Sequence, residues 1–458
     1  MKLARGNTSR EGGLLAWLVI LLIAAGAFFA YRRVPAPSKA APTDGPPPNQ
    51  IVMNDVRIEI FDESFRQTAE LRGKTATTFK DSSDLVLEPA DCVLIREHGH
   101  NVHITSTVAR KVVQRGQPDH LDFTGDVNVE SAGRKLLSEK LTYTPNSRLL
   151  ESGAPVTIKT TGSVILGDHL KSQTDLKTGT IDGDVQITSF GEGGRALDAP
   201  MLVRGKRSEF NLDRGLYDVI GSAWAKKTDS EIKADKMSFN RKRNTLTADG
   251  NAVASKPEVV VKAGHLEYWI DREAGTATEN PKAVMMTPRT TSEDETRSDL
   301  VAKSIEMDFK HQILEGKEDV SLQRLVKFEG DWEPDYKIRA KSVTSLYAKG
   351  RSTFKDDVKI EASKVGAEGD RAIFYQGTGK LYIIGHAKAW EFDDDHQKLN
   401  PIEGDKLLHD LHTNKTRVLG NFRGEHNDTE APPRKRNTGP GGPKKRVEIK
   451  FNEGGTDE

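Results

Sequence analysis

A single cysteine, Cys92, occurs among the 458 residues, so the sequence excludes an internal disulfide framework and a multi-cysteine zinc site. Net charge is also absent, because 68 basic residues balance 68 acidic ones, and no bulk charge is available to attract nucleic acid. Catalytic motifs are missing as well: the chain has no Gly-x-Ser-x-Gly, no phosphate-binding glycine-rich loop before a helix and no paired His-Glu helix. We therefore expect neither an enzyme nor a cofactor, and no nucleic-acid partner.

One long apolar run is present, over residues 14–31. Its 18 uncharged residues just span a bilayer as a helix, so we expect a transmembrane anchor that leaves residues 1–13 in the cytoplasm. A cleaved signal peptide is the alternative, since Ala25, Gly26 and Ala27 fit a small-x-small cleavage site. The apolar run continues past that site, which favours the anchor. Both interpretations place the rest of the chain outside the cytoplasm.

Two segments have the composition of linkers. Residues 32–50 are rich in proline and predict an extended spacer that holds the folded part off the membrane. Residues 426–458 combine proline, glycine and two basic triplets, and predict a disordered tail. The triplets resemble a nuclear signal or a phosphate-binding patch, but behind a membrane anchor a solvated linker explains them better.

Between these segments the helical period is almost absent, and strict alternation replaces it. Stretches such as "VNVES", "VTIKT" and "VQITSF" place apolar residues at every second position, which is the period of a strand with one dry face. Turn residues recur between them, as in "FNRKRN" and "IDREAG". The body of the chain is therefore predicted to be all-β and antiparallel.

A loose phrase repeats through the body: a small residue, an apolar one three positions on, and an aromatic one at five. It occurs at Ala234 with Met237 and Phe239, and it is followed after a turn by a strand containing Gly-x-Val or a close relative. Repeats of 28 to 40 residues predict stacked hairpins that share one continuous interior. The small residues and glycines would let the sheet bend where a larger side chain would clash.

Two clusters resemble metal sites. His98, His100 and His103 lie within "EHGHNVH", but an exposed hairpin turn explains the same letters. The stretch "FDDDHQ", residues 392–397, lacks the alternating spacing and the glycine of a calcium loop. We predict no metal site from either cluster.

The order of the hairpins resembles the OstA-like family of periplasmic lipopolysaccharide-transport proteins, which includes LptA, LptC and the N-terminal domain of LptD. The hairpin phrase "FTGDVNVESAGRKLLSEKLTYTPNSRLLESGAPVTI" at residues 123–158 is similar to that family, and the segment "VRIEIFDESFRQTAELRGKTATTFKDSSDLVLEPADCVL" behind the anchor is similar to LptC. The resemblance implies an LptC-like domain over residues 51–190 and an LptA-like domain over residues 191–425. An ordinary LptC has one such domain, so this chain is longer than expected.

The resemblance implies an all-β, antiparallel slab of repeated hairpins, folded like a taco or an incomplete jelly roll and preceded by one transmembrane helix. Its groove would hold the acyl chains of lipopolysaccharide or a related glycolipid. The protein would be a single-pass inner-membrane protein with its bulk in the periplasm. It would accept lipid from an inner-membrane ABC transporter and pass it to LptA-like bridge proteins docked by edge-strand addition.

The alternating apolar positions supply the candidate groove residues. An ordinary sandwich core explains the same positions, because both uses require a dry face. The candidates are Leu141, Tyr143, Val156, Ile158, Val185, Ile187, Met237, Phe239, Leu266, Tyr268, Met307, Phe374, Leu381 and Ile383.

Two other functions fit parts of the pattern. A parallel β-solenoid that is structural or carbohydrate-binding predicts coils of near-constant length, whereas the repeats here vary in length. A structural cell-surface protein would carry no lipid, so lipid that co-purifies with the protein distinguishes it from a transport protein.

Overall fold

The computed structural model describes residues 49–424, except residues 81–82, 97–98, 114–118, 192–196, 287–295, 329, 363, 393–396, 412 and 414. The predicted anchor, the basic tail and nearly all of the proline-rich linker lie outside the described residues. Within the described part, none of the helices has the length and apolar character needed to cross a membrane.

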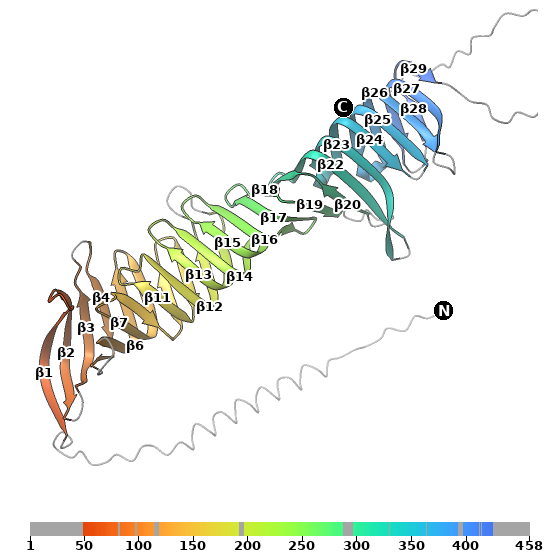
Figure 1. Cartoon of the computed structure of the whole chain (residues 1–458). Coiled ribbons are helices and arrows are strands. Elements are labelled where there is room, and N and C mark those ends of the chain that lie inside the picture. The colour runs from red at the N-terminus through yellow and green to blue at the C-terminus, as the bar shows by residue number, and fades with distance from the viewer. Residues whose placement is uncertain are drawn as a thin grey trace, which may run out of the picture. The chain divides into compact units, whose positions relative to one another are not determined.

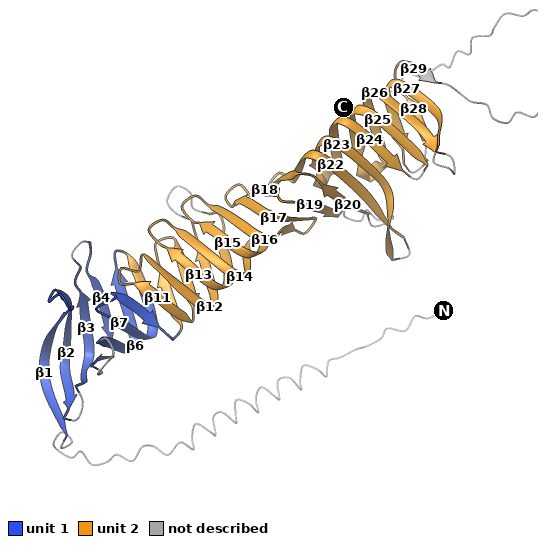
Figure 2. Cartoon of the chain, viewed as in Figure 1, with its two compact units in different colours: residues 1–132, 136–154 blue, residues 133–135, 155–458 orange. Residues whose placement is uncertain are grey.

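The described chain is almost entirely antiparallel β-structure, which confirms the predicted fold class. It divides into two compact units: unit 1 comprises residues 1–132 and 136–154, and unit 2 comprises residues 133–135 and 155–458 (Figure 2). The first eight strands are β1 (Gln50–Phe61), β2 (Gln67–Phe79), β3 (Leu85–Leu94), β4 (Val102–Ser106), β5 (Val108–Val112), β6 (His120–Ser131), β7 (Arg134–Thr144) and β8 (Leu149–Ser152).

The described part of unit 2 contains the remaining strands and two short 3₁₀ helices. The strands are β9 (Val156–Lys159), β10 (Ser163–Gly167), β11 (His169–Gln173), β12 (Thr178–Ser189), β13 (Met201–Asn211), β14 (Leu216–Lys227), β15 (Ser230–Asn240), β16 (Thr245–Lys256), β17 (Val259–Trp269), β18 (Ala274–Thr278), β19 (Lys282–Met286), β20 (Thr296–Val301), β21 (Ser304–Asp308), β22 (Ile313–Phe328), β23 (Asp331–Leu346), β24 (Arg351–Ala362), β25 (Val365–Tyr375), β26 (Lys380–Phe392), β27 (Lys398–Asp410), β28 (Lys415–Val418) and β29 (Phe422–Gly424). The 3₁₀ helices are η2 (Tyr347–Lys349) and η3 (Gln376–Thr378).

Strands of unit 2 pair in chain order, so they form a stack of rungs (Figure 1). Where a rung is interrupted, its two halves pair with the same neighbour: β10 and β11 both pair with β12, and β28 and β29 both pair with β27. β18 with β19, and β20 with β21, are two further split rungs. Stacked hairpins, as predicted from the repeat, are the unit of construction.

The long rungs bend near their middle, and β16 shows how. Gly250 and Asn251 both have left-handed φ angles, +74° and +49°, and the pairing register shifts beside them. A Cβ on Gly250 would lie 2.6 Å from the Asp235 carboxylate, which accepts a hydrogen bond of 2.9 Å from Asn251 Nδ2. Glycine therefore relieves both a backbone and a steric conflict at the bend.

This bend has a signature in the sequence. A small residue and an aspartate stand in one strand, and the glycine of the bend follows the aspartate by fifteen residues. At Gly369, a Cβ would lie 2.7 Å from Ile383 Cγ2, which confirms that small residues are needed where the rungs turn. The aspartate–glycine pairs are Asp168/Gly183, Asp235/Gly250, Asp370/Gly385 and Asp405/Gly420.

The bend folds the two halves of each rung over one interior. Tyr336 and Phe374 come from opposite halves of β23 and β25, and their ring centroids lie 5.0 Å apart. Buried positions alternate along each half, as in β16 with the pattern of Leu246 and Ala248 before the bend and Ala252 and Ala254 after it. The predicted alternation is therefore confirmed as the origin of the core.

Candidate functional site

All fourteen predicted groove residues lie in β-structure and point inward. Leu141 and Tyr143 of β7 belong to unit 1, and the other twelve belong to unit 2. Their exposed fractions range from 0 to 4%, so they are core residues in this structure. Contact of these side chains with lipid stays a prediction.

Aromatic side chains pack against one another at several levels of the interior of unit 2. Tyr217 and Phe239 stack with centroids 5.7 Å apart, and Tyr268 and Phe309 lie 6.2 Å apart. Burial raises the pKa of the Tyr268 hydroxyl well above its ordinary value. An acyl chain that enters here must therefore displace packed side chains or separate the two halves of the rungs.

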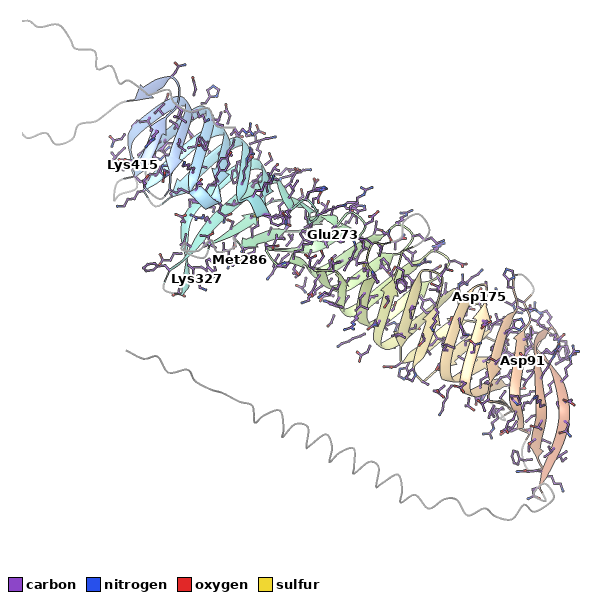
Figure 3. The ribbon with its side chains drawn as sticks, turned by 180° about the vertical axis from the view of Figure 1, so that it is seen from behind. Asp91, Asp175, Glu273, Met286, Lys327 and Lys415 are labelled. Carbon is purple, nitrogen blue, oxygen red and sulfur yellow. The ribbon has the colours of Figure 1, made fainter. Side chains whose placement is uncertain are left out.

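A cavity of 450 Å³ opens at the C-terminal end of unit 2, where Lys415 is labelled in Figure 3. Its apolar wall comes from Val365, Ala389 and Ile402, none of which was among the predicted residues. Val365 lies on β25, Ala389 on β26 and Ile402 on β27. The alternating apolar pattern around Ala389 was a usable signal, but the aromatic phrase that guided the prediction covers none of the three. The remaining lining residues are Trp390, Glu391, Asn400, Lys415, Thr416 and Arg417.

The ends of the rungs lie on two margins, because antiparallel strands turn alternately at one side and the other. We call margin A the side with the turns after β14, β16 and β24, and margin B the side with the turns after β13, β15 and β17. Side chains bridge the margins at several rungs. Ser163 of margin A and the Tyr217 hydroxyl of margin B lie 2.8 Å apart, and Gln376 Nε2 of margin B donates to Thr296 Oγ1 of margin A at 3.2 Å.

An ionic cluster makes the same connection in the middle of unit 2. Lys227 and Lys256 come from margin A, and Glu273 comes from margin B; we call these three residues the clasp (Glu273 is labelled in Figure 3). Lys227 Nζ lies 3.4 Å from Glu273 Oε1, and Lys256 Nζ lies 2.9 Å from Glu273 Oε2. Lys227 also donates to the Ile270 carbonyl at 3.4 Å and lies 2.7 Å from an Asp198 carboxylate oxygen.

The clasp is mostly withdrawn from water. The side chains of Lys227, Lys256 and Glu273 are 5%, 12% and 16% exposed. Burial alone would lower the pKa of Lys256, but hydrogen bonds to Glu273 and Asp229 outweigh it, and the pKa is raised. Lys256 is therefore charged at neutral pH. Each lysine of the clasp depends on the opposite margin or on nearby acids for its ionic partner.

Each unit also ends in an edge strand. In unit 1, β1 pairs with β2 and exposes Ile51, Val52 and Met53. In unit 2, the C-terminal edge is formed by β28 and β29, both paired with β27. Leu419 N donates to Lys406 O at 2.7 Å. In an antiparallel ladder, successive residues point their backbone N–H and C=O groups alternately towards and away from the paired strand, so those of Val418 point away from β27.

The suspected metal clusters gain no support. His98 and most of the residues 392–397 lie outside the described residues, and His103 lies exposed on β4. Within the part of the chain that the structure describes, no group of three His, Cys, Asp or Glu side chains is arranged to hold a metal ion. Cys92 is fully buried, and burial raises the pKa of its thiol.

Comparison with known families accounts for most of the chain. Residues 17–189 match the family described as lipopolysaccharide-assembly, LptC-related. Residues 231–415 match the family described as LptA/(LptD N-terminal domain) LPS transport protein. The chain therefore combines a region that matches the LptC-related family with a region that matches the LptA/LptD N-terminal family. The resemblance given by the hairpin phrases is thereby confirmed, and the role of the chain is in lipopolysaccharide transport. No curated protein matches the sequence.

The two matches do not touch: the LptC-related match ends at residue 189, and the LptA/LptD-type match begins at residue 231. The compact units divide elsewhere, between residues 132 and 155. The predicted domain boundary at residue 190 stays a prediction. Both families are described as transport or assembly proteins, which agrees with the absence of catalytic motifs from the sequence.

Proposed function

We propose that this protein is a membrane-anchored periplasmic scaffold that accepts lipopolysaccharide from an inner-membrane ABC exporter and passes it towards the outer membrane. Residues 14–31 would anchor it as a single-pass inner-membrane protein, with the bulk of the chain in the periplasm. The acyl chains would occupy the interior of the β-slab, and LptA-like bridge proteins would dock on its edge strands.

One observation carries the proposal: an LptC-related match is followed in the same chain by an LptA/LptD-type match. The interior of each unit is apolar along its rungs, which suits acyl chains, since each buried methylene stabilises binding by roughly 0.8 kcal/mol. The cavity beside Val365 offers room without displacing packed side chains. A structural or carbohydrate-binding β-repeat without lipid transport is the alternative that the first experiment tests.

Photo-crosslinking tests the lipid path. A benzoyl-phenylalanine in place of Val365 lines the cavity, and in cells it should capture lipopolysaccharide on irradiation. The same probe in place of Tyr382, on the outward-facing side of β26, is the matched control and should capture little or none. Immunoblotting for lipopolysaccharide on the purified chain measures both. Equal capture at both positions, or none at Val365 in a folded chain, would exclude this interior as the path.

Edge docking is tested by replacing Val418 with proline. Proline removes an N–H that faces away from β27, so the fold should survive while crosslinking from β28 to a bridge protein falls severalfold. Leu419→Pro is the control, because it removes the N–H that donates to Lys406 O and should instead loosen β28 itself. Site-specific crosslinking and limited proteolysis separate the two effects. Undiminished crosslinking in the folded Val418→Pro variant would mean that the lipid does not leave through this edge.

A further inference from the structure

The clasp joins parts of unit 2 that the sheet ladder leaves unconnected. β14 and β16 pair with β13, β15 and β17, and none of these ladders links margin A to margin B. Glu273 supplies the link, because one carboxylate oxygen faces Lys227 and the other faces Lys256. Lys256 also lies 6.0 Å from the centroid of the Phe309 ring on margin B. Both ionic contacts between the margins at this level therefore share one carboxylate, and the hydrogen bond from Lys227 to the Ile270 carbonyl lies beside them.

The turn that carries Glu273 repeats along margin B, but its acidic residue does not. Glu273 has a left-handed φ of +51°, and the corresponding turns hold a residue in the same region at the same place. Among the described turns of unit 2, the corresponding residues are Gly215, Asn244, Gln312, Gly350 and Gly379. In the turn before β12 the left-handed residue, Leu176, lies one place earlier, and Lys177 occupies the place of Glu273. None of these is an acid, so Glu273 is not a by-product of the turn. A second ion pair between the margins, Arg134 with Asp213, lies near the start of unit 2 and uses a different position of its turn.

Large apolar side chains lie directly inside the clasp. Tyr268, Ile270 and Phe309 are 4%, 0% and 1% exposed, and the backbone of Phe309 donates to the Glu273 carbonyl at 2.9 Å. Separation of the margins at this level would uncover all three. Outward of the clasp lie Asp198 and Asp229, whose side chains are 77% and 56% exposed and which can retain the lysines after Glu273 has moved.

We propose that the clasp is a lateral gate, which closes the interior of unit 2 in the state described here and opens to admit or release acyl chains through the side of the slab. The proposal rests on the function proposed above. Asp198 and Asp229 stay with the lysines during opening, so the ammonium groups keep a counter-charge while the bonds to Glu273 break. Because opening at the clasp leaves the β-ladders intact, the slab can open and close repeatedly without unfolding.

The gate is tested by measuring the distance between its margins. Spin labels at Thr228→Cys on margin A and Arg272→Cys on margin B flank the clasp at exposed positions, and the buried Cys92 stays unlabelled. In the full chain in detergent, pulsed electron spin resonance should give one narrow distance distribution. Glu273→Gln should broaden it and shift it to longer distances. Glu231→Gln is the matched control, since the Lys226–Glu231 bridge of 3.1 Å joins neighbouring strands, and it should change nothing.

The same distribution in Glu273→Gln as in the wild type, or an equal shift in both variants, would overturn the proposal. If Glu273→Gln does not fold, Lys256→Met with Glu273→Gln carries the test, because Lys227 then keeps Asp198 as its counter-ion. A photoprobe in place of Phe309 adds a second readout: lipid capture should rise severalfold in Glu273→Gln. The distance measurement needs no lipid, so a failed gate and a failed transport function give different results.

Discussion

Replacing Phe239 with alanine should lower the free energy of unfolding by about 3–5 kcal/mol, the usual cost of truncating a fully buried phenylalanine. Phe239 is 0% exposed, lies opposite Tyr217 in the β14–β15 ladder and stacks on its ring. Truncation removes that contact and leaves a cavity that the neighbouring rungs cannot fill without changing register. Denaturant titration of the full chain, followed by far-ultraviolet circular dichroism, measures the loss.

Phe328→Ala is the control for this prediction. Phe328 ends β22 and is 57% exposed, so its truncation should change the free energy of unfolding by no more than about 0.5 kcal/mol. Equal effects at the two positions would show that the interior around Phe239 is not packed as described. Normal stability of Phe239→Ala in the presence of lipopolysaccharide, together with instability in its absence, would instead show that lipid fills the vacated space.

Gly250→Val should be the second most damaging change and should lower the free energy of unfolding by about 2–3 kcal/mol. The left-handed φ of +74° costs a β-branched residue roughly 1–2 kcal/mol. The added Cβ must also displace the Asp235 carboxylate from 2.6 Å away, which weakens the bond from Asn251 by about 1 kcal/mol. Thermal unfolding of the full chain, followed in the same way, should show a lower transition temperature.

A glycine free of both constraints provides the comparison. A Cβ on Gly377 in η3 would meet no atom within 4 Å, and its φ lies outside the left-handed region. Gly377→Val should therefore change stability by about 0.5 kcal/mol or less. If Gly250→Val were equally mild, the bend would tolerate a side chain, and the spacing of aspartate and glycine would have no structural cause.

The fold was predictable because alternation and turn residues are local signals. The alternating apolar pattern around Met237 and Phe239 predicts which face of the strand points inward, without any knowledge of the partner strand. The spacing from Asp235 to Gly250 was equally visible in the sequence and was overlooked, since only the glycine and the small residue were counted. Its meaning depends on a register shift between adjacent strands, which a single strand does not reveal.

The closure of the slab was not predictable in the same way. Lys227 and Glu273 lie in ordinary charged turns of the sequence, and nothing local distinguishes them from solvated residues. They meet because the rungs bend, which brings margin A and margin B together across the interior. A burial pattern also cannot distinguish a packed core from a lipid-binding groove. The fourteen apolar candidates do point inward, but their contact with lipid stays a prediction.

The pairing of strands in chain order limits how such a protein can change length. Consecutive rungs run in opposite directions, so the loss of one rung would reverse every later rung and move its turns to the opposite margin. Residues that now bridge the margins, such as Lys227 and Glu273, would then lose their facing partners. Removal or addition of two rungs preserves direction and facing. A slab built in this way can therefore lengthen only by whole hairpins if its bridging residues are to keep their facing partners.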